Sequence, residues 1–170
     1  MKLPATLLIL SAVVGLSCVS YAETSPVSIQ VEKAGKLESK EKEKSKTERR
    51  TLKITVMNTS KAEVTVKVKY TWFGHAIGSH DVVIVDQGDR DATVKPSGSE
   101  IVETPATSVT SIEAHYGPDK KKVDASGNKI LGYAVQAFIG DKMVAENYEP
   151  ESMKDQVGKA VVAKKEEVKK

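Results

Sequence analysis

The feature that most constrains this chain is the segment Val64–Trp72, in which apolar and polar side chains alternate without a break. One face carries Val64, Val66, Val68, Tyr70 and Trp72, and the other carries Thr65, Lys67, Lys69 and Thr71. Strict alternation of β-branched and aromatic residues with polar ones is typical of a strand with one buried and one wet face. The segment therefore predicts a β-strand whose Trp72 side belongs to a core.

Two shorter alternating runs precede this strand, at Val27–Val31 and Leu52–Val56. A polar turn, Asn58-Thr59-Ser60-Lys61, separates the second run from Val64, so Leu52–Val56 and Val64–Trp72 are predicted to pair as an antiparallel hairpin. The Asn-Thr-Ser triplet also fits an N-glycosylation acceptor. The role of Asn58 in a turn is sufficient to explain it.

Further strands are expected downstream. Residues 81–86 read as a strand buried on both faces, followed by a turn at Gln87-Gly88-Asp89 and a short return strand at 92–95. The segment 108–116 fits either a helical turn or a loose strand. Residues 130–139 and 143–148 are joined through Gly140-Asp141, which is a good signal for a hairpin.

The segment 33–50 has a different composition, because charged residues dominate it and Leu37 is its only large apolar residue. It cannot line a core, so we expect a charged, solvated loop. The alternative is an extension of an edge strand whose charges discourage pairing between sheets.

About seven short strands with turn signals between them predict an all-β fold, an immunoglobulin-like antiparallel β-sandwich spanning 23–150. In 151–170 the apolar residues Met153, Val157, Ala160 and Val161 lie at helical spacing, which predicts a short C-terminal helix before a charged tail. The block Leu52–Trp72 and the turn Pro96-Ser97-Gly98-Ser99-Glu100 resemble bacterial secreted immunoglobulin-like and fibronectin-like modules. That resemblance implies a role in adhesion, scaffolding or assembly.

Residues 1–22 read as a cleavable signal peptide: Lys2, an apolar stretch to Val19, then small residues before a cleavage point after Ala22. Export to a periplasm, cell surface or extracellular space follows, with no transmembrane segment after cleavage. A membrane anchor is the alternative reading of the stretch. Cys18, the only cysteine, offers a third reading, a lipid-anchored envelope protein, although the residues before it fit a lipidation signal poorly.

No motif of a nucleophilic, phosphate-binding or metal-dependent enzyme is found, so we expect a non-enzymatic protein without cofactor or metal. Asp86, Asp89 and Asp91 cluster near Gly88, but they lack the order of residues in a calcium-binding loop. A formal net charge of +3, mixed in sign, does not favour nucleic acid as a partner.

The candidate binding residues are Phe73, His75, His80 and Phe138. The two phenylalanines are the best candidates for exposed aromatic contacts, and the histidines flank the loop 74–80. Together with the strand edges and the loop 117–128, these residues predict a role in adhesion, scaffolding or assembly of an envelope or surface appendage. The expected partners are other envelope or surface proteins. The alternative is a secreted protein that binds a glycan or small ligand.

Overall fold

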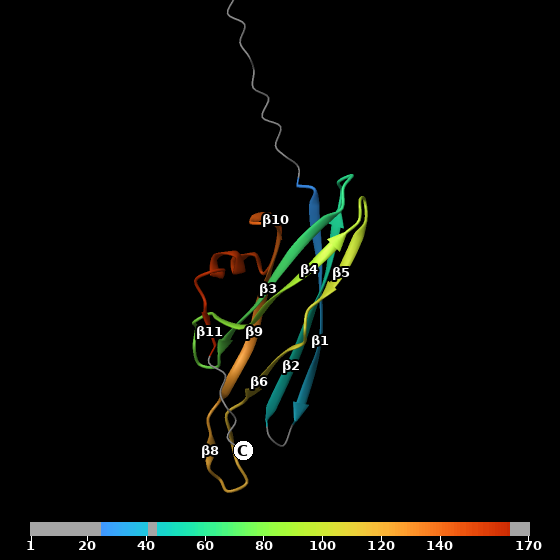
Figure 1. Ribbon diagram of the computed structural model, residues 1–170. Helices are drawn as coiled ribbons and strands as arrows, with labels where there is room; N and C mark the ends of the chain where they lie inside the picture. The colour runs from blue at the N-terminus through green and yellow to red at the C-terminus, as the bar shows by residue number, and fades with distance from the viewer. Residues whose placement is uncertain (1–24, 41–43, 164–170) are drawn as a thin grey trace, which may run out of the picture.

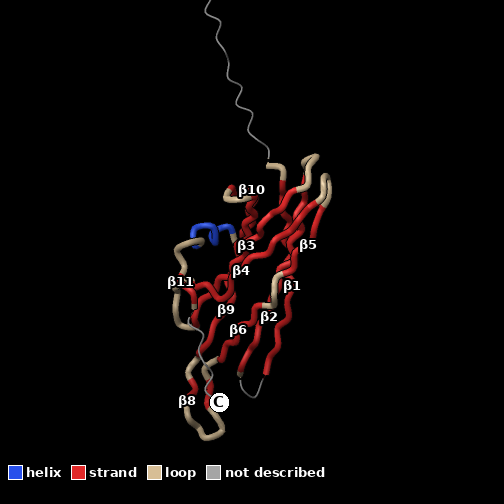
Figure 2. The backbone as a smooth tube through the Cα atoms, in the orientation of Figure 1, coloured by secondary structure: helices blue, strands red, loops and turns tan. Residues whose placement is uncertain are grey.

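The computed structural model describes residues 25–40 and 44–163, so the predicted signal peptide and the end of the tail lie outside the described residues. It is an all-β sandwich, as predicted (Figures 1 and 2). One continuous nine-stranded sheet follows the order β1-β2-β6-β9-β3-β4-β11, with β5 beside β2 and β10 beside β9. A separate two-stranded sheet, β7-β8, brings the described residues to eleven strands rather than about seven.

The nine-stranded sheet folds over at the β6–β9 junction, where Ser111 and Ile112 pair with Gly127 and Ser126, and this gives two packed layers. Layer A holds β1 (Val27–Lys40), β2 (Ser45–Asn58), β5 (Ser99–Glu103) and β6 (Thr107–Ile112). Layer B holds β3 (Val64–Ala76), β4 (Val83–Val94), β9 (Ser126–Ile139), β10 (Lys142–Glu149) and β11 (Val161–Val162). The small sheet consists of β7 (His115–Tyr116) and β8 (Lys122–Val123).

The main core lies between the layers and follows the predicted alternation. Leu52, Ile54 and Val56 of β2 face Val66, Val68 and Trp72 of β3, and all six are fully buried. Trp72 also meets Tyr133 of β9 edge to face, with ring centroids 5.7 Å apart. This geometry is favoured by aromatic quadrupoles, and the prediction that Trp72 is a core residue is confirmed.

The predicted hairpin between Leu52–Val56 and Val64–Trp72 is wrong. β2 pairs with β1, β5 and β6, whereas β3 pairs with β4 and β9, so the turn after Asn58 carries the chain from one layer to the other. Asn58 is only 2% exposed, and its side-chain amide donates to the carbonyls of Ala62 at 2.8 Å and of Val94 and Lys95 at 3.1 Å. Asn58 is therefore a buried link between layers, and it does not offer its amide for glycosylation.

The predicted solvated loop at 33–50 is also wrong. Residues 35–40 of β1 pair with residues 45–50 of β2 in the same unbroken register as the rest of the two strands, from Val27 opposite Asn58 to Lys40 opposite Ser45. We call these two segments the arm. The alternative of an edge extension is the one that the structure adopts, because backbone pairing with β1 and β6 orders a segment that has almost no apolar side chains.

Strand β4 runs through the turn expected at residues 87–89 and the return strand expected at 92–95, so both predictions are wrong. Gly88 marks a close approach instead, since a Cβ there would lie 2.6 Å from the hydroxyl oxygen of Tyr70 on β3. The ambiguous segment 108–116 forms strands β6 and β7, not a helical turn. The β9–β10 hairpin through Gly140-Asp141 is confirmed, and Gly140 adopts a φ of 58°.

The C-terminal segment forms a short 3-10 helix, η2 (Glu151–Gln156), and then β11, which pairs parallel to β4. Met153 is buried against the outer face of layer B, in a second cluster with Phe73, Ile84 and Ala134. The helical spacing predicts that Val161 belongs to the buried face of a docked helix. This prediction is wrong, because Val161 belongs to β11 and is 73% exposed. In residues 25–40 and 44–163, no helix is long and apolar enough to cross a membrane.

Candidate binding surface

The outer face of layer B exposes the polar side of the alternation in β3. Lys67 lies opposite Asp91 of β4 on one side and Phe138 of β9 on the other, and Lys69 lies opposite Asp89 and Gln136. These side chains form a shallow groove of about 580 Å³, which we call the Phe138 groove. Its lining consists of Thr65, Lys67, Lys69, Asp89, Asp91, Phe138, Gly140 and Asp141.

The groove combines an aromatic ring with charges of both signs. The Lys69 ammonium lies 4.8 Å from the centre of the half-buried Phe138 ring, within range of a cation–π contact. Lys67 Nζ lies 3.8 Å from Asp89 Oδ2, with side-chain exposures of 48% and 60%. Ion pairs this exposed contribute little to stability. The lysines and aspartates can therefore exchange their present partners for the hydroxyl or amide groups of a ligand.

A second hollow of about 370 Å³ shares Lys69 and Asp89 with the groove and continues along the same face. It adds the side-chain amides of Gln87 and Gln136 and the hydroxyl of Thr71. The surface is thus open along the strands and offers hydrogen-bond donors and acceptors in succession.

Beyond Gln136, a chain of hydrogen bonds leads to η2. Gln136 Nε2 donates to the Tyr148 hydroxyl at 3.2 Å, and that hydroxyl donates to Glu146 Oε2 at 2.8 Å. Lys154 of η2 pairs with the same carboxylate. Hydrogen bonds from Lys154 and Tyr148 lower the pKa of Glu146, and burial raises the pKa of Tyr148. Glu146 therefore stays ionised, and it fixes this end of the surface.

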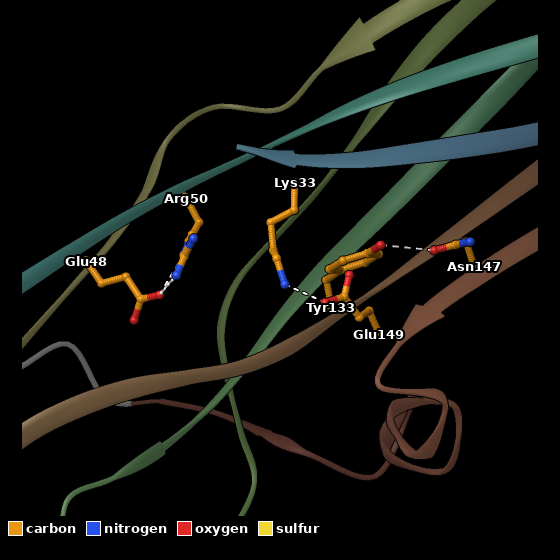
Figure 3. Close-up of polar contacts among 6 residues, drawn as sticks. All are labelled: Lys33, Glu48, Arg50, Tyr133, Asn147 and Glu149. Atoms are coloured by element: carbon orange, nitrogen blue, oxygen red, sulfur yellow. Dashed lines mark hydrogen bonds and ion pairs between the residues drawn. The ribbon is translucent and has the colours of Figure 1, made fainter. Parts of the chain in front are cut away.

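A separate polar cluster lies where the arm leaves the sandwich (Figure 3). Lys33 Nζ of β1 lies 2.5 Å from Glu149 Oε1 of β10, which joins the two layers at their edge. Tyr133 donates its hydroxyl hydrogen to Asn147 Oδ1 at 3.1 Å. The hydrogen bond from Lys33 holds the pKa of Glu149 below its usual range, while burial, aided by the charge of Glu149, raises the pKa of Tyr133 to about 12.

Arg50 belongs to the same region but pairs within its own strand, with a guanidinium nitrogen 2.5 Å from Glu48 Oε1. Its side chain lies across Gly35 of β1, where a Cβ would come within 2.6 Å of Arg50 Cδ. Lys33 and Arg50 therefore each face a carboxylate already. We interpret this cluster as a structural link rather than a ligand site.

Of the four predicted site residues, only Phe138 lies in the groove. Phe73 points to the face opposite Trp72, as expected, but it is fully buried there because Met153 and its neighbours cover it; its prediction as a surface contact is wrong. His75 is half-buried, with Nδ1 3.0 Å from the Ser79 carbonyl oxygen, and His80 is exposed in the following loop. Because His75 lies eight residues along β3 from Lys67, it is ~26 Å away.

Sequence reasoning missed the residues that surround Phe138. The alternation correctly places Lys67 and Lys69 on the wet face of their strand. It does not give the register between β3 and β9 that sets these lysines beside Phe138. Asp89 and Asp91 were assigned to a turn region and turn out to be outward positions of β4. Asp86 is engaged elsewhere, because its Oδ2 accepts a 2.6 Å hydrogen bond from Thr107. Within the described ranges, no group of three or more His, Cys, Asp or Glu could hold a metal ion.

No protein-family model matches the chain, and no curated protein matches it either. Among solved structures it is similar to a β-glucuronidase from Bacteroides uniformis, with 10% identity, a TM-score of 0.46, and coverage of 72% of this chain and 14% of that one. A β-glucuronidase from glycoside hydrolase family 2 gives 13% identity, a TM-score of 0.41, and coverage of 72% and 12%.

A protein from Akkermansia muciniphila is similar over more of its own length, with 12% identity, a TM-score of 0.44, and coverage of 82% of this chain and 81% of that one. This chain spans about one seventh of the length of the Bacteroides uniformis enzyme. At these identities and scores the likeness extends to a generic β-sandwich and no further.

Proposed function

We propose that this protein is an exported, non-catalytic binding module that holds an extended saccharide in the Phe138 groove at a cell envelope or surface. The observation that carries the proposal is the groove itself, about 580 Å³ on a sheet face, where one aromatic ring lies among carboxylates and ammonium groups. Through this groove the protein would adhere to surfaces that carry glycans.

The chemistry of the lining matches a saccharide. Sugar hydroxyls both donate and accept hydrogen bonds, so they suit a surface where Lys67 and Lys69 donate and Asp89, Asp91 and Asp141 accept. An aromatic ring provides a large contact area for the apolar face of a sugar ring at low entropic cost. Since two cations and three anions line the groove, no single sign of charge dominates it, which favours a ligand without strong charge.

The shape of the surface favours an extended ligand over a compact one. The groove is shallow, and the second hollow of about 370 Å³ shares Lys69 and Asp89 with it. A linear oligosaccharide of several units can therefore contact Phe138 and, further along, Gln136 and Gln87. Export rests on the predicted signal peptide at residues 1–22, and lipid anchoring through Cys18 stays the alternative that an intact-mass measurement of the cell-derived protein decides.

The test is a glycan array probed with the secreted protein, followed by titration calorimetry of each oligosaccharide that binds. Phe138→Ala should weaken binding of such an oligosaccharide by about tenfold or more, equivalent to about 1.4 kcal/mol. The matched control is Ile101→Ala, which removes an exposed apolar side chain from β5 in layer A and should leave binding unchanged.

A second variant, Asp89→Asn, removes the carboxylate shared by both hollows and should also weaken binding, although the side chain keeps its size. Thermal unfolding of each variant without ligand shows whether the fold is retained. Absence of binding to any glycan, or equal binding by Phe138→Ala and the parent protein, would overturn the proposal.

A further inference from the structure

Strand β1 forms the outer edge of layer A, and one side of its backbone faces away from β2. It pairs with β2 over all 14 of its residues, and no other strand in the described part of the chain pairs with it. An edge presents unpaired N–H and C=O groups to any strand that can approach it. Edges are commonly protected by bulges, prolines, short length or charged side chains. β1 has an unbroken register, contains no proline and is among the longest strands of the sandwich, and its charged side chains are of both signs.

The side chains of β1 are complementary to a second copy of the same strand. If two β1 strands lie antiparallel with Ala34 opposite Ala34, each Glu32 faces a Lys36 and each Val31 faces a Leu37. Glu32, Ala34 and Lys36 then share the outer face of layer A, because side chains alternate along a strand. Opposite charges and paired apolar residues across strands are stabilising.

Other registers are less favourable. Centring the pair on Glu32, Lys33 or Lys36 sets that charged residue opposite its own copy, and centring it on Gly35 sets Glu32 opposite Glu38. Like charges directly opposite one another are destabilising. Centring the pair on Leu37 also sets Lys36 opposite Glu38, but it pairs only residues 34–40 of β1, whereas centring on Ala34 pairs residues 28–40. Charge and overlap together therefore favour the Ala34 alignment, which has the two-fold symmetry of a closed dimer.

The exposure of Leu37 is consistent with this arrangement. Leu37 is 66% exposed, the most exposed leucine in the described residues, and it belongs to neither core cluster. Its contact in the proposed alignment is Val31 of the second copy, which is half-buried against the main core.

We propose that β1 is an interaction edge that pairs antiparallel with β1 of a second copy of this chain, so that layer A continues across a two-fold axis at Ala34. The partner is the same protein, and the arms of the two copies point in opposite directions along the joined sheet. The outer face of layer B stays open on each copy, so the dimer presents two Phe138 grooves.

The first test measures association by sedimentation velocity across a concentration series, using the full chain secreted through its own leader. Glu32→Lys places two ammonium groups together at each of the two Glu32–Lys36 pairs, and it should raise the dimer dissociation constant at least tenfold. Glu32→Lys combined with Lys36→Glu restores opposite charges and should restore association. Glu100→Lys on β5 makes the same change of charge on another strand and should have no effect.

The second test fixes the register by crosslinking in a Cys18→Ser background. Ala34→Cys brings the two thiols together at the axis, so a short bis-maleimide should link the copies, whereas Leu37→Cys should link them poorly. The proposal is overturned by a protein that stays monomeric at all concentrations, by association that Glu32→Lys leaves unchanged, or by crosslinking through Leu37→Cys in preference to Ala34→Cys.

Discussion

The two halves of β2 belong to one strand and are built from opposite kinds of residue. In the half that ends at Asn58, Leu52, Ile54 and Val56 are fully buried between the layers. The half that begins at Ser45 carries charged and hydroxyl side chains, and the register with β1 continues through it unchanged. Alternation of apolar residues therefore reports which part of a strand is packed. Strand structure itself extends as far as neighbouring backbones provide partners.

The packed half should be the more sensitive of the two. Leu52→Ala removes a side chain that is fully buried in the main core, and it should lower the free energy of unfolding by about 2–5 kcal/mol, through lost transfer free energy and a residual cavity. Urea unfolding followed by tryptophan fluorescence measures this, since Trp72 lies in the same cluster. A loss below about 1 kcal/mol would contradict the assignment of Leu52 to the core.

Asn58 ends the packed half of β2, and substituting it should cause the second-largest decrease in the free energy of unfolding. Asn58→Ala leaves the carbonyls of Ala62, Val94 and Lys95 without the amide that now donates to them, so we expect a loss of about 1–3 kcal/mol. The matched control is Ser60→Ala, an adjacent turn residue whose hydroxyl bonds only locally to Ala62. Equal losses for the two variants would show that the link between layers contributes nothing beyond the turn.

Glu149 of β10 contacts Lys33, which lies opposite Leu52 where the two halves of β2 meet. The stability of this junction should therefore depend on pH. The pKa of Glu149 is lowered from 4.5, first by the hydrogen bond from Lys33, so its ionised form is favoured in the folded state. The resulting stability is present above the unfolded pKa and is lost as the pH falls through the lower folded pKa.

Glu149→Gln should therefore reduce stability at pH 7, and the difference should disappear once the pH has fallen below the lowered pKa of Glu149. The difference at pH 7 should not exceed about 1 kcal/mol, because the pair is half-exposed. Thermal unfolding from pH 2 to 8 measures it, with Glu100→Gln on β5 as the control. A difference that stays constant over this range would exclude the Lys33–Glu149 pair as its cause.

The arm should be the least sensitive region. Arg49 is exposed on β2, next to Arg50, and Arg49→Ala should change the free energy of unfolding by less than about 0.5 kcal/mol. Urea unfolding under the conditions used for Leu52→Ala gives a direct comparison within one strand. A loss that approaches the value for Leu52→Ala would mean that the arm is packed against a partner in solution.

Sequence reasoning identified β2 and β3, which line the core, because their apolar residues alternate with polar ones, as at Val66, Val68 and Trp72. It fails on the arm and at 87–89, because charged and turn-forming residue types suggest loops there, whereas neighbouring strands supply pairing partners for the backbone. The paired partners of β2 were also missed. The buried hydrogen bonds of Asn58, which direct the chain to the other layer, depend on residues more than 30 positions away.

The candidate surface was predictable only in part. Phe138 is named from its residue type, and the wet face of β3 is assigned correctly, but bringing them together requires the register between β3 and β9. Phe73 shows the opposite case. It was placed on the correct side of its strand, and its burial depends on Met153, which is distant in sequence and belongs to an element with weak local signals.

Residues 151–160, which cover Phe73 and Ile84, leave the ribosome after every strand of layer B except β11. A chain that emerges amino end first therefore carries an uncovered apolar patch on an otherwise paired sheet until residues 151–160 arrive, and such patches are where nascent chains aggregate or recruit chaperones. A chain truncated after Pro150 represents that stage and should bind a hydrophobic dye that the full chain excludes. Arrival of residues 151–160, rather than pairing of strands, is therefore the step that covers this apolar patch.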